Sequence, residues 1–331
     1  MKTKYFNKKN YFYHGLMFHH IHDNKRYKFG QGSVSIQEFK KIIRFVGRKN
    51  ILDAQEFIHK LTNKKLKSNH VCLTFDDALK SQIDLIIPVL EKLKIKAFFF
   101  VYSEIFTNPK KQKLELYRYF RTNFFKNADT FNNEFLYLVK KKFNLDIDKI
   151  IRQKKLKIFG YTIKAWKIKF PYFSDSDIKF RIVRDNILST KKYDRIMEIF
   201  FKKKKFVKSK ILDKLFFSKK DLKNLVKKGH FIGLHSHTHP TLISKFSKNK
   251  QLFEYKKNKS ILEKIINKRV ISMSHPCGSY NKVTINILKE LDIKLGFKQI
   301  MTLDKEMKKI NQNPFEIARH DAPSILRQLN K

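Results

Sequence analysis

Two adjacent carboxylates and a group of histidines are the residues of this sequence best suited to chemistry. Asp76 and Asp77 directly follow the apolar run VCLTF at 71–75. The block GLHSHTHPTL at 233–242 carries three histidines, which are His235, His237 and His239. Imidazole nitrogens and carboxylate oxygens bind divalent metals, and a carboxylate beside a metal can take a proton from water. The two blocks together predict a hydrolytic metal site.

The carboxylate pair stands at the end of an apolar run, and this position decides in which directions the two side chains can point. On a continuing strand, Asp76 and Asp77 would point to opposite faces. At the carboxyl end of a strand the chain turns, so both side chains can reach one site, and active sites of parallel α/β folds collect at these ends. The alternative is that Asp77 caps a following helix while Asp76 makes a surface salt bridge, and the pair taken alone favours this alternative.

The histidine spacing shifts the balance toward a metal. His235 and His239 are four residues apart, which can place two imidazoles on one side of a tight turn, and Pro240 requires that turn to end. With Asp77 they would leave coordination positions open, as catalytic zinc sites do. The same set could hold ferrous iron in an oxygenase, but the carboxylate next to Asp77 favours hydrolysis. His237 either supports the ligands or points outward.

A third segment, SHPCGSYN at 274–281, also follows an apolar run. Pro276 and Gly278 shape a tight loop, and backbone N–H groups of such a loop can point into a cleft and stabilise the oxyanion of acyl transfer. Taken alone, Pro-x-Gly predicts only a turn.

The elements that position these motifs are predicted by short apolar runs bounded by turn residues. Strands are expected near residue 15 and at 71–75, 97–101, 230–234 and 270–274. Helical periodicity follows Ser35, Asp84 and Ser260, while Ser218 fits the N-cap of a helix that Gly229 ends. Strands that alternate with helices predict a mostly parallel sheet. Cys72 is expected to be a core residue of its strand.

Residues 103–217 break this alternation, because they predict aromatic-rich helices with no clear strand. The 331 residues could form one large α/β barrel or two ordinary domains. Since no linker or repeat is visible, we interpret residues 1–331 as a single catalytic domain and 103–217 as a helical insertion that acts as a lid. A separately folding module is the alternative.

The charge is extreme, with 74 Lys and Arg against 29 Asp and Glu and a formal net charge of +45. Such a balance ordinarily indicates nucleic acid or an anionic membrane as partner. The basic residues are spread along the chain with many Ile, Asn and Phe, as AT-rich coding would produce, so a solvated Lys-rich surface is the favoured interpretation. The densest run is Lys202 to Lys205 with Lys208 and Lys210. Its natural partner would be an anionic lipid surface or an anionic sugar carrier.

The sequence shows no secretory signal and no apolar run of bilayer length. Cys72 and Cys277 lie far apart without metal-type spacing, and a reducing compartment would leave both as thiols. We therefore expect a cytoplasmic protein whose contact with membranes, if any, is peripheral.

The three motifs, in this order and each after a short strand, resemble the polysaccharide deacetylases. These are the family-four carbohydrate esterases, which include chitin, peptidoglycan and nodulation-factor deacetylases. The family's Thr-Phe-Asp-Asp block matches 74–77, its His-Ser/Thr-x-x-His-Pro block matches 235–240, and its Pro-x-Gly loop matches 276–278. The resemblance covers roughly residues 14–102 and 218–323. It implies a distorted, incomplete (β/α) barrel.

The resemblance also implies roles for the matched residues. Asp76 would be the general base, while Asp77, His235 and His239 would hold one divalent metal. Zn²⁺ is the expected ion, with Co²⁺, Mn²⁺ and Ni²⁺ as alternatives. The backbone N–H of Cys277 would help form the oxyanion hole, and the reaction would remove an N-acetyl group from an amino sugar.

The sequence departs from the family pattern in two places. Ala78 replaces the usual Gly after the aspartates, and because Ala is small we expect little effect. The arginine that many members carry before the Pro-x-Gly loop is missing, since Ser274 and His275 stand there. We expect Arg319 to orient the base in its place, and His320 to be the general acid that protonates the leaving amine.

Other residues are expected to line the substrate cleft. The segment MFHHIHD resembles the Tyr-His block that opens some bacterial exopolysaccharide deacetylases. His19 or His20 would then face the cleft, with a packing role as the alternative. Pro276, Gly278 and Tyr280 of the third motif are expected to contact substrate.

The expected substrate is an N-acetylated sugar of a glycan or an envelope-polysaccharide precursor. In a cytoplasmic protein it would be lipid-linked or nucleotide-linked. One alternative is a hydrolase of the same fold that acts on an N-formyl or O-acetyl group. The other is a non-catalytic basic protein that uses the barrel as a scaffold for anionic lipid or nucleic acid, although no specific nucleic-acid partner is expected.

Overall fold

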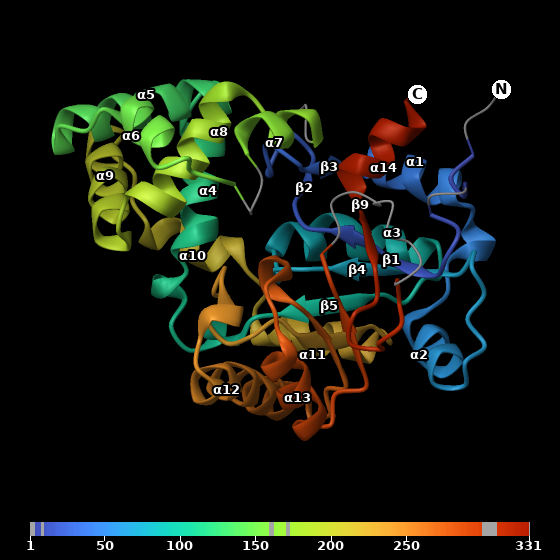
Figure 1. Ribbon diagram of the computed structural model, residues 1–331. Coiled ribbons are helices and arrows are strands. Elements are labelled where there is room, and N and C mark those ends of the chain that lie inside the picture. Colours follow the sequence, from blue (N-terminus) through green and yellow to red (C-terminus); the bar gives the residue numbers. More distant parts are fainter. Residues whose placement is uncertain (1–3, 8–9, 159–161, 170–172, 300–309, 331) are drawn as a thin grey trace. The chain divides into compact units, whose positions relative to one another are not determined.

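The computed structural model describes residues 4–7, 10–158, 162–169, 173–299 and 310–330 (Figure 1). The chain divides into two compact units. The first comprises Met1–Gln112 with Leu212–Lys331, and the second comprises Lys113–Ile211. None of the described helices has the length and apolar character that a membrane span requires.

A parallel sheet of seven strands forms the centre of the first unit, in the order β8-β7-β6-β5-β4-β1-β9. Its strands are β1 (His14–Phe18), β4 (Val71–Phe75), β5 (Phe98–Val101), β6 (Phe231–Leu234), β7 (Ser272–Ser274), β8 (Leu295–Phe297) and β9 (Arg319–Asp321). Just before β9, Ile317 pairs with Phe297 of β8, so the two edges of the sheet almost meet. The predicted distorted, incomplete barrel is confirmed, with its unsealed seam between β8 and β9. A separate pair, β2 (Ile21–His22) and β3 (Val34–Ser35), lies outside it.

Helices follow the strands along the chain. Those of the first unit are α1 (Ile36–Val46), α2 (Ala54–Thr62), α3 (Ile87–Lys92), α11 (Lys219–Lys227), α12 (Lys248–Ile266), α13 (Lys282–Glu290) and α14 (Ala322–Leu329). The helix α10 (Ser209–Leu215) crosses the boundary between the units. Ser35 and Ser218 cap α1 and α11, each in a capping box with an acidic residue three positions later. Both predicted helix starts are thus confirmed.

Side chains alternate between two cores along each strand. One core fills the barrel interior, with Cys72, Phe98, Phe100 and Phe297 among its buried members. The other lies outside the sheet and contains residues of the alternate strand positions together with the apolar faces of α1 and α11. Whether a strand residue takes an odd or even position therefore decides whether it faces the interior.

The helix α12 differs from its prediction, because it begins at Lys248 and not near Ser260. Its early turns bury Gln251, Glu254 and Asn258. Buried polar side chains break the apolar periodicity from which a helix is predicted, so the sequence pattern showed only the second half of this helix.

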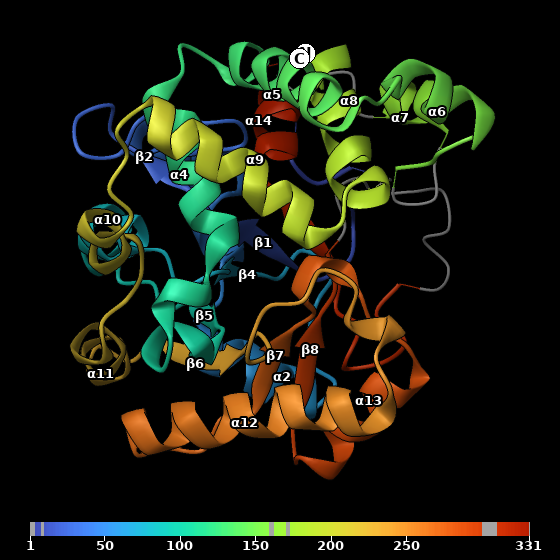
Figure 2. The same cartoon turned by 90° about the vertical axis from the view of Figure 1, so that its left-hand side faces the viewer.

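The second unit is built from helices. They are α4 (Lys113–Phe124), α5 (Ala128–Phe143), α6 (Ile147–Gln153), α7 (Ile163–Lys169), α8 (Asp175–Ile182) and α9 (Thr190–Lys203) (Figure 2). Their core is aromatic, and the Arg121 guanidinium lies 5.6 Å from the ring centre of Phe131 and 5.1 Å from that of Phe180. Burial lowers the pKa of Arg121 to about 10. The predicted insertion at 103–217 thus contains a compact helical unit at 113–211, and its role as a lid stays a prediction.

Part of the predicted basic run is balanced within this unit. Lys203 forms an ion pair with Glu134 at 3.2 Å, and Lys208 forms one with Glu198 at 2.6 Å. Lys202 and Lys205 of the same run are exposed.

Near the N-terminus of the first unit, a tyrosine connects two buried histidines. The Tyr5 hydroxyl lies 2.5 Å from His14 Nε2 and 3.1 Å from His320 Nδ1. Burial lowers the pKa of His14 to about 4 and, together with the neighbouring His14 and the charge of Arg327, lowers the pKa of His320 to about 3. Both imidazoles are therefore neutral in the folded protein at neutral pH.

This cluster predicts a loss of stability at mildly acidic pH. The unfolded chain takes up protons on these histidines near their usual pKa of about 6.5, whereas the folded chain does so only near pH 4 and 3. The free energy of unfolding should therefore fall as the pH is lowered from about 6.5, by about 1 kcal/mol per histidine between about pH 6.5 and 5.5. Urea unfolding followed by circular dichroism at both pH values measures this.

A variant comparison isolates the contribution of one histidine. His320→Gln should reduce the pH-dependent loss by about 1 kcal/mol, whereas the same change at the exposed His59 should leave the loss as in the parent protein. Equal pH dependence in His320→Gln and the parent would contradict the prediction.

Candidate functional site

The motif residues meet at the carboxyl ends of neighbouring strands of the first unit. Asp76 and Asp77 follow β4, His235 follows β6, and Ser274 ends β7. Arg319, from the first position of β9, reaches the same place from inside the barrel. This is the edge at which active sites of parallel sheets are found.

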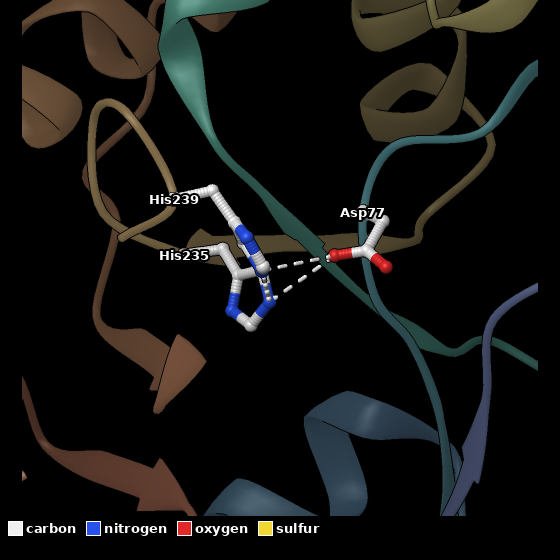
Figure 3. A group of neighbouring side chains, drawn as sticks. All are labelled: Asp77, His235 and His239. Carbon is white, nitrogen blue, oxygen red and sulfur yellow. Dashed lines mark hydrogen bonds and ion pairs between the residues drawn. The ribbon is translucent and has the colours of Figure 1, made fainter. Parts of the chain in front are cut away.

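Asp77, His235 and His239 converge on one point (Figure 3). Asp77 Oδ1 lies 3.4 Å from His235 Nε2 and 3.3 Å from His239 Nε2, and the two nitrogens are 3.2 Å apart. Ligand atoms around a tetrahedral metal with bonds of about 2.0–2.2 Å are separated by about 3.3–3.6 Å. Among the described residues, buried Asp77 Oδ1 forms ion-pair contacts with these two imidazoles and has no further hydrogen-bond partner. The three groups therefore fit one divalent ion.

The hydrogen bonding of His235 supports this arrangement. Its Nδ1 lies 2.9 Å from the carbonyl oxygen of Ser274, which can only accept a hydrogen bond. The proton of a neutral His235 is thus on Nδ1, and the lone pair of Nε2 points toward Asp77, as a metal ligand requires.

The charge of Asp77 is fixed by its neighbours. Burial by itself would raise the pKa of Asp77, but His235 and His239, when protonated, outweigh burial and hold this pKa well below its usual range. The carboxylate is therefore ionised and can act as an anionic ligand.

The backbone at both ligand segments is in an uncommon conformation. Asp77, Ala78 and His239 have φ values of 73°, 52° and 56°, in the left-handed region that non-glycine residues rarely adopt. The turn at Asp77 and Ala78 lets both carboxylates serve one site. Ala78 takes up the conformation for which the family's usual glycine is better suited, so the turn is kept despite the substitution.

Asp76 is held by a buried arginine. Arg319 donates from Nη1 to Asp76 Oδ1 and from Nη2 to Oδ2, both at 2.8 Å, and Ser274 Oγ donates to Oδ2 at 3.2 Å. Burial would raise the pKa of Asp76, but the charge and the hydrogen bonds of Arg319 are the main influences that outweigh it and lower the pKa below its usual value. Arg319 thus contacts Asp76 as expected for a substitute of the missing arginine, and Ser274 adds a contact that was not expected.

Of the two N-terminal histidines, His19 is the one that faces Asp76. Its Nε2 lies 3.7 Å from Asp76 Oδ2, and 26% of its side chain is exposed. His20 is half-buried, and its carbonyl accepts a hydrogen bond from the Val34 N–H. Gln82, which the sequence motifs did not indicate, donates to the carbonyls of both His19 and Asp76 and so joins the two segments.

Two histidines lie away from this group. His320 pairs in register with Leu16 and contacts Tyr5 on the outer side of the sheet, because neighbouring strand residues face opposite sides. Its position does not fit the predicted role of general acid. His237 has its Nδ1 2.9 Å from Ser103 Oγ, so its imidazole is engaged away from the metal ligands.

The third motif forms a tight turn after β7. Pro276–Gly278 is a short helical turn in which Cys277 and Gly278 have φ values of 51° and 67°. The turn is tied to the segment after the histidines, because Ser244 N–H donates to Ser279 Oγ at 3.1 Å. The Tyr280 hydroxyl donates to Glu316 at 2.6 Å. Tyr280 therefore has a protein partner, and its contact with substrate stays a prediction.

The convergence of three ligands makes a testable prediction about metal binding. His239→Asn should weaken Zn²⁺ affinity by more than about 100-fold, since removing a direct ligand should cost at least as much as removing a residue that only supports one. His237→Asn, a matched change in the same block, should keep the affinity of the parent, because its imidazole contacts Ser103. Chelator competition and metal analysis measure both, and parent-like affinity in His239→Asn would contradict the assignment.

Comparison with solved structures supports the fold. Streptococcus pyogenes deacetylase PplD, solved in complex with acetate, has a TM-score of 0.52 at 16% identity, with 95% of this chain and 96% of that chain covered. IcaB from Ammonifex degensii has a TM-score of 0.52 at 14% identity, with 96% and 97% covered. A de-N-acetylase from Aggregatibacter actinomycetemcomitans has a TM-score of 0.51 at 12% identity, with 96% and 99% covered. The TM-scores and coverages show a shared fold, and at identities this low the comparison shows the fold alone.

Family membership comes from the sequence comparison. No match was found among curated proteins. The family model for polysaccharide deacetylase matches residues 63–119 and 142–296, which is more than half of the chain and includes the aspartate, histidine and Pro-x-Gly motifs. The chain belongs to the polysaccharide deacetylase family.

Proposed function

We propose that the protein is a metal-dependent hydrolase that removes the N-acetyl group from an amino sugar of a glycan or envelope-polysaccharide precursor. The observation that carries this proposal is the convergence of three metal-binding side chains beside a second, ionised carboxylate. Asp76 Oδ2 lies 3.9 Å from His235 Nε2, so base and ligands border the same space. Zn²⁺ is the ion that the two imidazoles and one carboxylate suit best.

The protein groups have separate tasks in this reaction. A divalent ion held by Asp77, His235 and His239 would supply Lewis acidity and lower the pKa of a water molecule. Asp76 accepts the proton of the attacking water, and Arg319 fixes the orientation of its carboxylate. The backbone N–H of Cys277 donates a hydrogen bond to the acyl oxygen, which becomes an oxyanion when water adds to the acyl carbon.

We assign the proton donor to His19 in place of His320. His19 is partly exposed and its Nε2 is 3.7 Å from Asp76, whereas His320 is buried against Tyr5 on the other side of the sheet. A donor near the base can return a proton to the leaving nitrogen and leave a free amine.

Removing the base should abolish turnover. With Zn²⁺ or Co²⁺ added, the parent protein should release acetate from an N-acetylated amino sugar, and Asp76→Asn should lower kcat by about 10²–10⁴-fold, since it cannot accept the proton. Enzymatic quantification of acetate measures this. Release of formate from N-formyl sugars, or of acetate from O-acetyl sugars only, would favour the alternative hydrolase activities.

A pair of neighbouring histidines provides the control for proton donation. His19→Gln should lower kcat with little change in KM, whereas the adjacent His20→Gln should remain close to the parent. Equal turnover in His19→Gln and the parent would remove His19 as the donor.

We further propose that the basic surface favours substrates on a phosphate-bearing carrier. Binding of the protein to vesicles with anionic phospholipid should weaken at least about tenfold between about 50 mM and 200 mM salt. Lys202→Glu/Lys205→Glu should weaken binding at low salt more than Lys256→Glu/Lys257→Glu, a charge-matched change on α12. Absence of binding at low salt would assign the lysine content to coding bias.

A further inference from the structure

We propose that Glu254 and Asn258 of α12 are positioning residues that preorganise His235 and His239 for the metal. The inference rests on the proposed metal site. Both side chains come from the helix whose first half was not predicted, and they lie one turn apart on one face of that helix.

Glu254 holds the middle of the histidine segment. Its side chain is buried, and Oε2 accepts hydrogen bonds from the backbone N–H groups of His237 at 2.9 Å and Thr238 at 2.8 Å. Oε1 accepts a further bond from the Thr238 hydroxyl at 2.7 Å. One carboxylate thus binds three donors in the stretch between the two ligands.

Asn258 holds the beginning of the same segment. It is fully buried, its Oδ1 accepts from the backbone N–H of His235 at 2.9 Å, and its Nδ2 donates to the carbonyl of Val101 at 3.0 Å. Because Val101 ends β5, Asn258 fixes the first ligand relative to the neighbouring strand.

The segment needs these supports because its backbone is strained. Ser236 and His239 have φ values of 62° and 56°, and Ser236 Oγ accepts a bond from the His239 N–H at 3.1 Å. Conformations of this kind persist only where surrounding contacts determine them. The contacts from α12 therefore maintain the turn that brings the two Nε2 atoms to 3.2 Å.

The choice of residues also argues for a role beyond packing. Tyr255 and Leu262 already anchor α12 in the apolar core. A carboxylate and an amide buried on the same helix carry a desolvation cost that apolar side chains would not. That cost is offset by hydrogen bonds to the ligand-bearing segment, so the two polar residues serve the geometry of the ligands.

Glu254→Gln tests the proposal, because it keeps the size of the side chain but replaces an acceptor oxygen with a donor. We expect the Kd for Zn²⁺ to rise about 10–100-fold, and the visible absorption bands of the Co²⁺-loaded protein to shift. Glu263→Gln is the matched control. Glu263 lies on the same helix and also accepts a backbone N–H, that of Val270, but it does not contact the histidine segment. It should keep the parent Kd and spectrum.

These measurements use no substrate, so they test the positioning role independently of turnover. A parent-like Kd and Co²⁺ spectrum in Glu254→Gln would overturn the positioning role alone. A parent protein that binds no metal would overturn both proposals. If Glu254→Gln does not fold, Thr238→Val removes only the hydroxyl bond to Glu254. It should raise the Kd by a smaller factor, and an unchanged Kd there would overturn the role.

Discussion

The buried ion pair between Arg319 and Asp76 is the interaction on which the rest of the site depends. Both side chains are almost fully buried, at 1% and 2% exposure, and breaking such a pair leaves an uncompensated charge at a cost of about 3–5 kcal/mol. The pair requires Arg319 to extend from β9 past β1 to the end of β4. Gly15 of β1 lies opposite Arg319, and a Cβ there would meet Arg319 Cγ at 3.0 Å. The ionised state of Asp76 therefore depends on the strand order β4-β1-β9 and on the glycine at position 15 of β1.

The positions of the proposed metal ligands depend on the conformation of the loops that carry them. Asp77 and His239 owe their direction to left-handed backbone, which the surrounding loops must hold. The histidine segment is held from α12, and the turn after β7 is joined to it through Ser244 and Ser279. The strands supply a rigid edge, while hydrogen bonds from neighbouring elements fix the side chains within it.

The elements that could be predicted from the sequence were those determined by contacts between residues close together in the chain. An apolar run that ends in two aspartates specifies a strand and a turn, and Ser35 with Glu38 specifies a helix start, because the responsible contacts lie within a few residues. Arg319 was expected beside Asp76 from the gap in the family pattern. Its neighbour His320 was expected there too, although adjacent positions of a strand cannot face one site. That error arose because the short strand β9 was not predicted. Glu254, Asn258 and Gln82 were missed because a polar residue in a helix appears exposed until its tertiary partners are known.

The separation of Asp76 and Arg319 by 243 positions in the chain has a consequence during synthesis. The three proposed ligands have all left the ribosome once His239 has emerged, whereas the partner of the base emerges only with β9. A growing chain can thus contain all three proposed ligands while Asp76 still lacks its guanidinium partner. Any chain that stops before Arg319 would carry the three proposed ligands without the partner that orients Asp76.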